Sequence, residues 1–165
     1  MLVGVLTISD RAAQGTYKDK SGPLLVEIVN RRSPWTVDLE STVGDSIEDI
    51  SLTIIDWCEL GANLILTTGG TGFSPRDVTP EATRDVIEKE APGIAEALRA
   101  KSLDITKHAM LSRAVSGIRG HTLIINLPGN PKAVKEHMDV LLPILPHALE
   151  LLIDSRDSEQ GHRVV

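Results

Sequence analysis

The sequence predicts an α/β fold, a three-layer sandwich in which helices cover both faces of a mostly parallel, mixed central sheet. Short apolar runs typical of buried strands alternate with segments whose apolar residues recur at helical spacing. Residues 114–118 and 122–127 read as a hairpin, which makes one strand antiparallel. We expect residues 1–153 to form a single domain and residues 154–165 to be a polar tail.

The first half of the chain contains two predicted strands and two predicted helices. Residues 2–8 are almost entirely β-branched or aliphatic, which indicates a buried strand. A helix should begin at residues 21–23 and end by Pro34. Residues 35–43 alternate between apolar and polar, as in a half-exposed strand near an edge. The next helix, ended by Gly61, should carry an apolar stripe of Ile47, Ile50, Ile54 and Cys58.

The second half begins with a short buried strand at residues 64–66. A helix is expected over residues 80–90, with Thr79 as its N-cap and Pro80 at its first position. A short helix should follow near residues 94–101, and residues 102–112 are expected to form a loop. After the hairpin, a long amphipathic helix should be kinked or split by its two prolines before it ends at Ile153.

Composition excludes several classes of function. The chain has only four aromatic residues, so its core should be aliphatic and base-stacking platforms for single-stranded nucleic acid are not expected. A net charge of −6 argues against nucleic acid or an anionic membrane as a partner. Cys58 is the single cysteine, so no intramolecular disulfide is expected, and its neighbours suggest a buried helical thiol.

The sequence also lacks the patterns expected for targeting, zinc binding and a hydrolase triad. Residues 1–7 lack the basic start of a signal peptide, and no apolar run approaches the ~20 residues of a membrane span, so a cytoplasmic location is expected. The histidines His108, His121, His137 and His147 show no zinc spacing, and we interpret them as structural or exposed. The serines lack the partners of a hydrolase triad.

A glycine-rich turn follows the strand at residues 64–66. Glycine permits close backbone approach, and successive N–H groups in such a turn can converge on an anion. Neither the Walker A pattern nor the dinucleotide pattern is present, so a plain tight turn is the alternative. Arg76 and Asp77 stand between this turn and the next helix, and a tight turn does not require them. The combination favours a phosphate site.

Four loops follow predicted strand ends, at residues 9–11, 44–45, 69–77 and 128–131. Parallel strands would bring these loops to one edge of the sheet, where α/β proteins bind ligands. There Asp45 and Asp77 could hold Mg²⁺, while the glycine turn, Arg76 and Lys132 could bind phosphates.

Each acid also has a simpler structural interpretation. Asp45 could serve only as a helix N-cap. Asp77 could pair with Arg76 or Arg84, or brace its loop. Asp10 could only order the loop in which it stands.

Five blocks resemble the molybdenum-cofactor biosynthesis family, and most closely its molybdopterin adenylyltransferase branch. They comprise residues 5–11, 67–82, 110–113, 117–120 and 123–131, in the order that the family has them. The resemblance covers approximately residues 2–153. Departures include Gly44 and Ser46, where the family often has proline and glutamate, and Lys107, where proline is common.

The resemblance implies a homotrimeric α/β sandwich that transfers AMP from ATP to the terminal phosphate of molybdopterin, with Mg²⁺ and release of pyrophosphate. Asp45 and Asp77 match the family's catalytic, metal-binding carboxylates. The nucleotide phosphates are expected at Gly69, Gly70, Thr71, Gly72, Arg76, Pro128, Gly129 and Asn130. Molybdopterin is expected at Ser9, Asp10, Ser102 and Ser112.

Two other functions remain open. A related MoaB-like branch keeps the fold although not all its members transfer AMP, so the protein could be a non-catalytic molybdopterin-binding scaffold. A nucleotide pyrophosphatase on a similar fold is a third alternative. The resemblance is also compatible with a molybdenum insertase as a partner.

Overall fold

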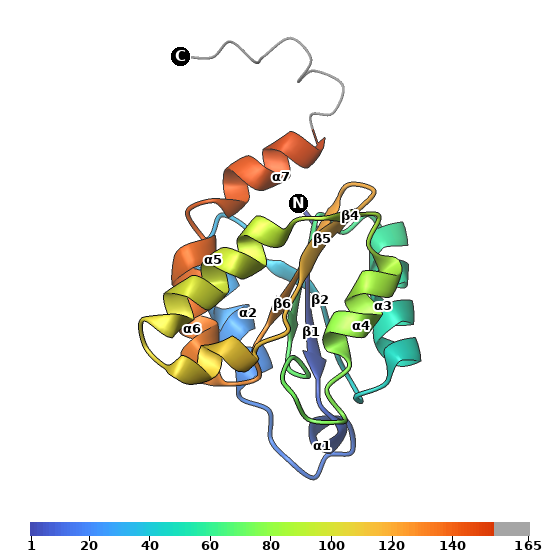
Figure 1. The fold of residues 1–165 in the computed structure, drawn as a ribbon. Helices are drawn as coiled ribbons and strands as arrows, with labels where there is room; N and C mark the ends of the chain where they lie inside the picture. The colour runs from blue at the N-terminus through green and yellow to red at the C-terminus, as the bar shows by residue number, and fades with distance from the viewer. Residues whose placement is uncertain (154–165) are drawn as a thin grey trace.

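A computed structural model describes residues 1–153 and shows one sheet between two layers of helices (Figure 1). The strands of these residues are β1 (Val3–Ile8), β2 (Val37–Val43), β3 (Leu64–Thr68), β4 (Lys89–Glu90), β5 (Ser116–Arg119) and β6 (Thr122–Leu127). They lie in the order β2-β1-β3-β6-β5-β4. The strands β2, β1, β3 and β6 are parallel, whereas β5 is antiparallel to both of its neighbours. The predicted mixed sheet is confirmed.

The helices divide between the two faces. They are α1 (Asp10–Ala13), α2 (Ser21–Arg32), α3 (Ile47–Glu59), α4 (Thr79–Val86), α5 (Pro92–Leu103), α6 (Pro131–Leu141) and α7 (Leu145–Ile153), with a 3-10 helix η1 (Lys107–Leu111) after α5. One core joins the sheet to α2, α5, α6 and α7, and the other joins it to α3 and α4 (Figure 1). Within the described residues, no helix is long and apolar enough to cross a membrane.

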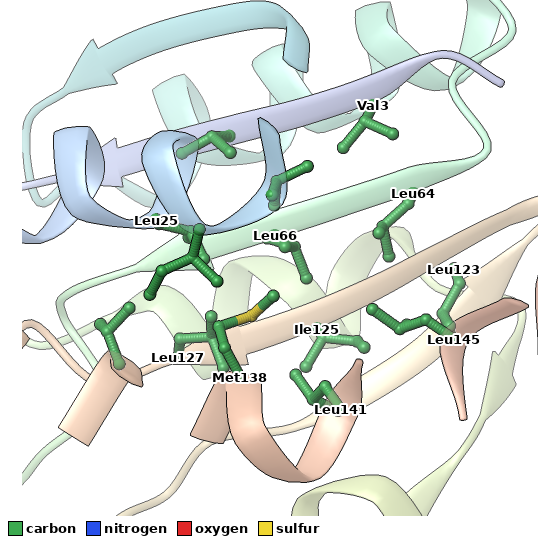
Figure 2. Close-up of a cluster of buried hydrophobic side chains, with 14 of the residues drawn as sticks. Val3, Leu25, Leu64, Leu66, Leu123, Ile125, Leu127, Met138, Leu141 and Leu145 are labelled. Atoms are coloured by element: carbon green, nitrogen blue, oxygen red, sulfur yellow. The ribbon is translucent and has the colours of Figure 1, made fainter. Parts of the chain in front are cut away.

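Successive side chains along the central strands point alternately into the two cores. Val3 and Val5 of β1 face the first core, while Leu6 and Ile8 face the second. Because helices cover both faces, these strands read as continuous apolar runs in the sequence. Figure 2 shows the first core, where Ile125 and the leucines of β3 and β6 pack against Leu25 and the side chains of α6. The buried residues of this first core include no aromatic side chain, as the scarcity of aromatic residues predicts, whereas the second core also contains Trp57.

Three further expectations are confirmed. β2 is an edge strand whose side chains alternate between half-buried and exposed. β5 and β6 form the antiparallel hairpin. The long C-terminal helix is split, because α6 ends at Leu141 and α7 begins at Leu145, on either side of Pro143.

The apolar stripe of α3 differs from the prediction. Ile47 is 41% exposed, and the buried residues of this helix are Ile50, Ile54 and Trp57. Ile47 is the first residue of α3, at the end of the helix, and lies outside the buried stripe. Cys58 is half-buried rather than fully buried, and burial raises the pKa of its thiol.

The segment between α4 and β5 also differs. The predicted helix over residues 80–90 ends at Val86, and Lys89 and Glu90 form the short strand β4. Hydrogen bonds to β5 outweigh helix propensity here, since the N–H of Glu88 donates to the carbonyl of Ile118 at 2.8 Å.

Two predicted loops contain helices. Residues 102–112 include the end of α5 and the 3-10 helix η1, so Ser102 is a helical residue. Ser9 caps α1, a single turn that no periodicity marks, by accepting a hydrogen bond from the N–H of Ala12. The predicted polar tail, residues 154–165, lies outside the described residues.

Candidate functional site

The carboxyl ends of β1, β3 and β6 meet at one edge of the sheet, where α1 and the glycine-rich loop lie together (Figure 1). A cleft of about 390 Å³ opens there. It brings together the predicted residues Ser9, Asp10, Asp45, Gly69, Gly70, Arg76, Asp77 and Gly129. Parallel pairing therefore assembles one site from four segments, as the sequence predicts.

The glycine loop is held tightly by the protein itself. Gly69 and Gly70 have φ values of +105° and +63°, which residues that carry a side chain rarely adopt. A Cβ on Gly69 would lie 2.2 Å from the carbonyl oxygen of Ile8, and one on Gly70 would lie 2.3 Å from Oγ1 of Thr79. The approach of a ligand is the predicted reason for these glycines, but the packing of the loop already requires them.

Thr79 does not act as the predicted N-cap. The N-cap of α4 is Val78, and Thr79 is the first helical residue. Its hydroxyl donates to the carbonyl of Gly69 at 2.9 Å, and its N–H donates to the carbonyl of Gly70 at 3.1 Å. Thr79 therefore ties the start of α4 to the glycine loop.

Asp10 and Asp45 join the loops after β1 and β2 by reciprocal hydrogen bonds. The N–H of Asp10 donates to Oδ2 of Asp45, and the N–H of Asp45 donates to Oδ1 of Asp10, both at 2.9 Å. Ser46 caps α3 by accepting from the N–H of Asp49. The alternative interpretation of Asp45 as the helix N-cap is therefore wrong.

Asp10 and Asp45 differ in their electrostatic environment. Arg76 donates to Oδ2 of Asp10 from Nε at 2.9 Å and from Nη2 at 2.7 Å. The N–H of Asp45 and the Arg76 guanidinium together lower the pKa of Asp10. Burial raises the pKa of Asp45, and the charges of Asp10 and Asp77 raise it further. Asp45 therefore lacks the positive partner that Asp10 has.

Asp77 braces the glycine loop. Its Oδ2 accepts hydrogen bonds from the N–H of Gly72 at 2.9 Å and of Ser74 at 3.2 Å. The loop-bracing interpretation is thus correct, whereas Arg76 pairs with Asp10 instead. Bracing occupies only one carboxylate oxygen, so a second role for Asp77 remains compatible with it.

The carboxylates of Asp45 and Asp77 fit a magnesium ion whose remaining ligands come from substrate phosphates and water. Within residues 1–153, no group of three or more His, Cys, Asp or Glu side chains could hold a metal alone. Mg²⁺ is commonly bound by one or two carboxylates together with waters and substrate phosphates. The hydrogen bonds described for Asp45 and Asp77 use Oδ2, so each acid keeps Oδ1 for a ligand.

Arg113 organises the loop, and the site prediction did not include it. Its Nε donates to the carbonyl of Gly72 and its Nη2 to the carbonyl of Asp77, each at 2.7 Å. It also forms an ion pair with Glu81, and its N–H donates to the carbonyl of Thr71. The only available signal was its place in one of the blocks that carry the family resemblance, because its partners are remote in sequence.

Asp19 is a second residue that the prediction missed. It lines the cleft and accepts hydrogen bonds from the hydroxyl of Thr7 at 3.0 Å and from the N–H of Ser21 and Gly22. Burial opposes ionisation of Asp19, but these hydrogen bonds outweigh it and lower the pKa. Its position two residues before Ser21, the first residue of α2, was the available signal, since an acid there can satisfy the first N–H groups of a helix.

A second cavity, of about 250 Å³, shares the glycine loop with the cleft. Its predicted residues are Thr71, Gly72, Ser102, Ser112 and Pro128. The four residues expected to bind molybdopterin are therefore divided, with Ser9 and Asp10 in the cleft and Ser102 and Ser112 in this second cavity. Asn130 lines neither space but caps α6 through the N–H of Lys132.

An α/β sandwich with a glycine-rich turn and acids at the carboxyl ends of its strands is an arrangement typical of nucleotide- or phosphate-binding proteins. The comparisons identify the family within this class. A family model described as "Probable molybdopterin binding domain" matches residues 4–147, and the chain belongs to this family.

Named relatives and solved structures agree. The chain is 48% identical to gephyrin from Dictyostelium discoideum over 98% of its own length, but it spans only 24% of that protein. It is 41% identical to molybdopterin adenylyltransferase from Helicobacter pylori, covering 92% of this chain and 87% of that one. A crystal structure of MoaB from Thermus thermophilus has a TM-score of 0.87 at 44% identity, covering 93% and 96% of the two chains.

Proposed function

We propose that the protein is a molybdopterin adenylyltransferase that transfers AMP from ATP to the terminal phosphate of molybdopterin and releases pyrophosphate. The observation that carries this proposal is the placement of Asp45 and Asp77 beside the glycine loop in one cleft. The names of the bacterial relatives support it. Residues 1–153 would form the functional unit.

The cleft suits the phosphates of ATP. The glycine loop offers backbone N–H groups, and Arg76, whose side chain is 65% exposed, can exchange Asp10 for a phosphate oxygen. Asp45 and Asp77 would hold Mg²⁺ through Oδ1, and the ion would supply positive charge to the phosphates. An acidic protein can thus bind an anionic substrate, because the positive field is local.

The second cavity suits the pterin. Ser102 and Ser112 offer hydroxyl groups there, while Thr71 and Gly72 connect it to the cleft. A terminal phosphate at this loop would lie beside the cleft proposed for ATP. Its oxygen forms the new bond to that phosphorus, the bond to the bridging oxygen breaks, and pyrophosphate leaves with the electron pair. The attacking oxygen is already deprotonated at neutral pH, so positioning and charge neutralisation are the main requirements.

A molybdopterin-binding scaffold without transfer activity is the second candidate. It is retained because the MoaB-like branch that the sequence resembles includes members that do not transfer AMP. The decisive assay measures pyrophosphate release from ATP and Mg²⁺ with and without molybdopterin. Release that requires molybdopterin supports the transferase, and molybdopterin binding without release supports the scaffold. Release without molybdopterin would identify a pyrophosphatase.

Assembly and location belong to the same proposal. We propose a cytoplasmic homotrimer that can pass its product to a molybdenum insertase. Exposed apolar side chains support an interface, among them Phe73, Leu103, Ile105, Met110 and Leu111. Contiguous patches of exposed apolar side chains commonly mark protein–protein interaction sites.

A further inference from the structure

A buried serine–histidine pair lies in the second cavity. Oγ of Ser102, on α5, is 2.8 Å from Nε2 of His137, on α6. The two residues are 9% and 5% exposed, and both line the cavity. The sequence alone indicates a structural or exposed His137, because its spacing from the other histidines suggests no ligand set.

The surroundings of the imidazole determine its charge and its tautomer. Burial lowers the pKa of His137 to about 4, so the ring is neutral at physiological pH and carries one N–H. Nδ1 is buried and has no hydrogen-bond partner among the described residues. A buried N–H without an acceptor is rarer than an unpaired acceptor. The proton therefore belongs on Nε2, which donates it to Oγ of Ser102.

This tautomer sets the hydrogen-bonding direction of the serine. Because Oγ of Ser102 accepts from His137, its own O–H remains free to be donated. Of the charged groups that line the cavity, Arg99 donates a hydrogen bond from Nη1 to the carbonyl of Ala114 at 2.7 Å, and Glu136 lies 3.9 Å from Nζ of Lys132. The pair therefore presents an uncharged donor to the cavity.

We infer that His137 is a positioning residue that holds Ser102 as a hydrogen-bond donor, so that the cavity selects a neutral heterocycle with a carbonyl oxygen or ring nitrogen facing this serine. The inference rests on the proposed placement of the pterin in this cavity. It assigns His137 a role in the affinity for molybdopterin and no role in ATP binding.

The test is a double-mutant cycle on molybdopterin binding, measured by direct titration of the full chain. His137→Leu and Ser102→Ala should each weaken binding about fivefold to tenfold, the worth of one hydrogen bond. The double variant should bind no more weakly than either single variant, because both remove the same interaction. His137→Gln, whose amide can donate in place of Nε2–H, should bind within about twofold of wild type. The affinity for ATP should not change.

Matched controls separate this role from folding and from the proposed function. His147→Leu changes an exposed histidine of α7 and should bind molybdopterin normally. Circular dichroism at the assay temperature confirms that each variant is folded. Wild-type affinity in His137→Leu, or additive losses in the double variant, would overturn the inference. AMP transfer by the wild type is measured in parallel, and its absence would overturn the proposed function whatever the cycle shows.

Discussion

Asp45 is the residue at which function and stability should conflict. Its raised pKa means that the folded state disfavours the charged carboxylate, so this penalty is complete above the folded-state pKa and disappears as the pH falls from there to the pKa of the unfolded chain. Asp45→Asn keeps the shape of the side chain and an oxygen to accept from the N–H of Asp10. We expect AMP transfer to fall about 10²–10³-fold, by analogy with the loss of one preorganised electrostatic group, while the melting temperature stays equal or rises.

The measurement pairs a transfer assay at saturating Mg²⁺ with thermal melting at pH 7.5. Asp77→Asn should lose activity similarly, and both variants should still bind molybdopterin. Asp85→Asn, which changes an exposed acid of α4, is the control and should change neither quantity. Turnover near the wild-type rate in both active-site variants would contradict the catalytic assignment.

His137 should make the fold sensitive to acid. Its pKa falls from 6.5 to about 4 on folding, so the unfolded chain binds a proton that the folded chain does not. The free energy of unfolding therefore decreases as pH falls from about 6.5 towards 4, by about 2 kcal/mol at pH 5. Urea titrations at pH 7.5 and pH 5 should show a smaller loss for His137→Leu than for wild type. Equal losses in the two proteins would show that His137 does not titrate in this way.

The sequence predicts some of these residues and not others, for a physical reason. Asp45 and Asp77 follow strand ends, and the parallel sheet makes that position sufficient to place them in one cleft. Arg113 and His137 reach their partners from another segment, through side chains whose direction depends on the packing of α5, η1 and α6. Neither spacing nor composition records such contacts.

At the scale of elements, two glycines with positive φ separate the cost of backbone strain from the cost of steric overlap. Gly61 follows α3, and Gly69 lies in the glycine loop. Gly61 has a φ of +90° with open space around it, whereas Gly69 has both a positive φ and a close neighbour. Gly61→Ala should therefore cost about 1 kcal/mol for strain alone, and Gly69→Ala should cost clearly more, about 3 kcal/mol or above.

Gly93 is the matched control for this series. It stands in α5 without a positive φ, and apart from its chain neighbours and its own helix backbone nothing lies within 4 Å of the position that an added methyl group would take. Gly93→Ala should be neutral or stabilising by up to about 1 kcal/mol. Urea unfolding of all three variants gives the comparison, and a Gly69→Ala variant as stable as Gly61→Ala would show that the loop can move away from Ile8.

Arg113 should couple η1 to the glycine loop. Arg113→Met leaves the carbonyls of Gly72 and Asp77 without their charged donor, and we expect a loss of at least about 2 kcal/mol in the free energy of unfolding. Arg113→Lys keeps the charge but loses the planar guanidinium that donates to both carbonyls at once, and it should recover only part of this stability. Faster proteolytic cleavage within residues 71–77 is the local readout. Cleavage at the wild-type rate in a folded Arg113→Met variant would contradict the coupling.

The elements that the sequence predicts well are those fixed by their own periodicity, such as β1, β3 and α2. β4 is different, because two charged residues, Lys89 and Glu90, form a strand only through their pairing with β5. Thr79 is likewise of a residue type common at N-caps, but its hydroxyl donates to the carbonyl of Gly69 instead of capping α4. Tertiary hydrogen bonds decided both cases.

At the scale of the whole molecule, the proposed homotrimer predicts a sedimentation mass three times the 17.8 kDa of the chain. Equilibrium sedimentation at micromolar concentration measures this directly. A mass of 17.8 kDa would exclude the trimer under those conditions. The family resemblance motivates this prediction, since no trimer interface could be derived from the periodicity of the sequence.

The strand order has a consequence for how the protein persists in the cell. β1 lies between β2 and β3, and β3 pairs next with β6, so each central strand must find a partner remote in the chain. Such pairings form only after long loops close, which slows folding. The cleft needs loops from all four of these strands, and only the native state can bind there. A ligand at 100 times its dissociation constant would then oppose unfolding by about 2.7 kcal/mol. Substrate supply would thus govern how long each molecule survives proteolysis as well as how fast it turns over.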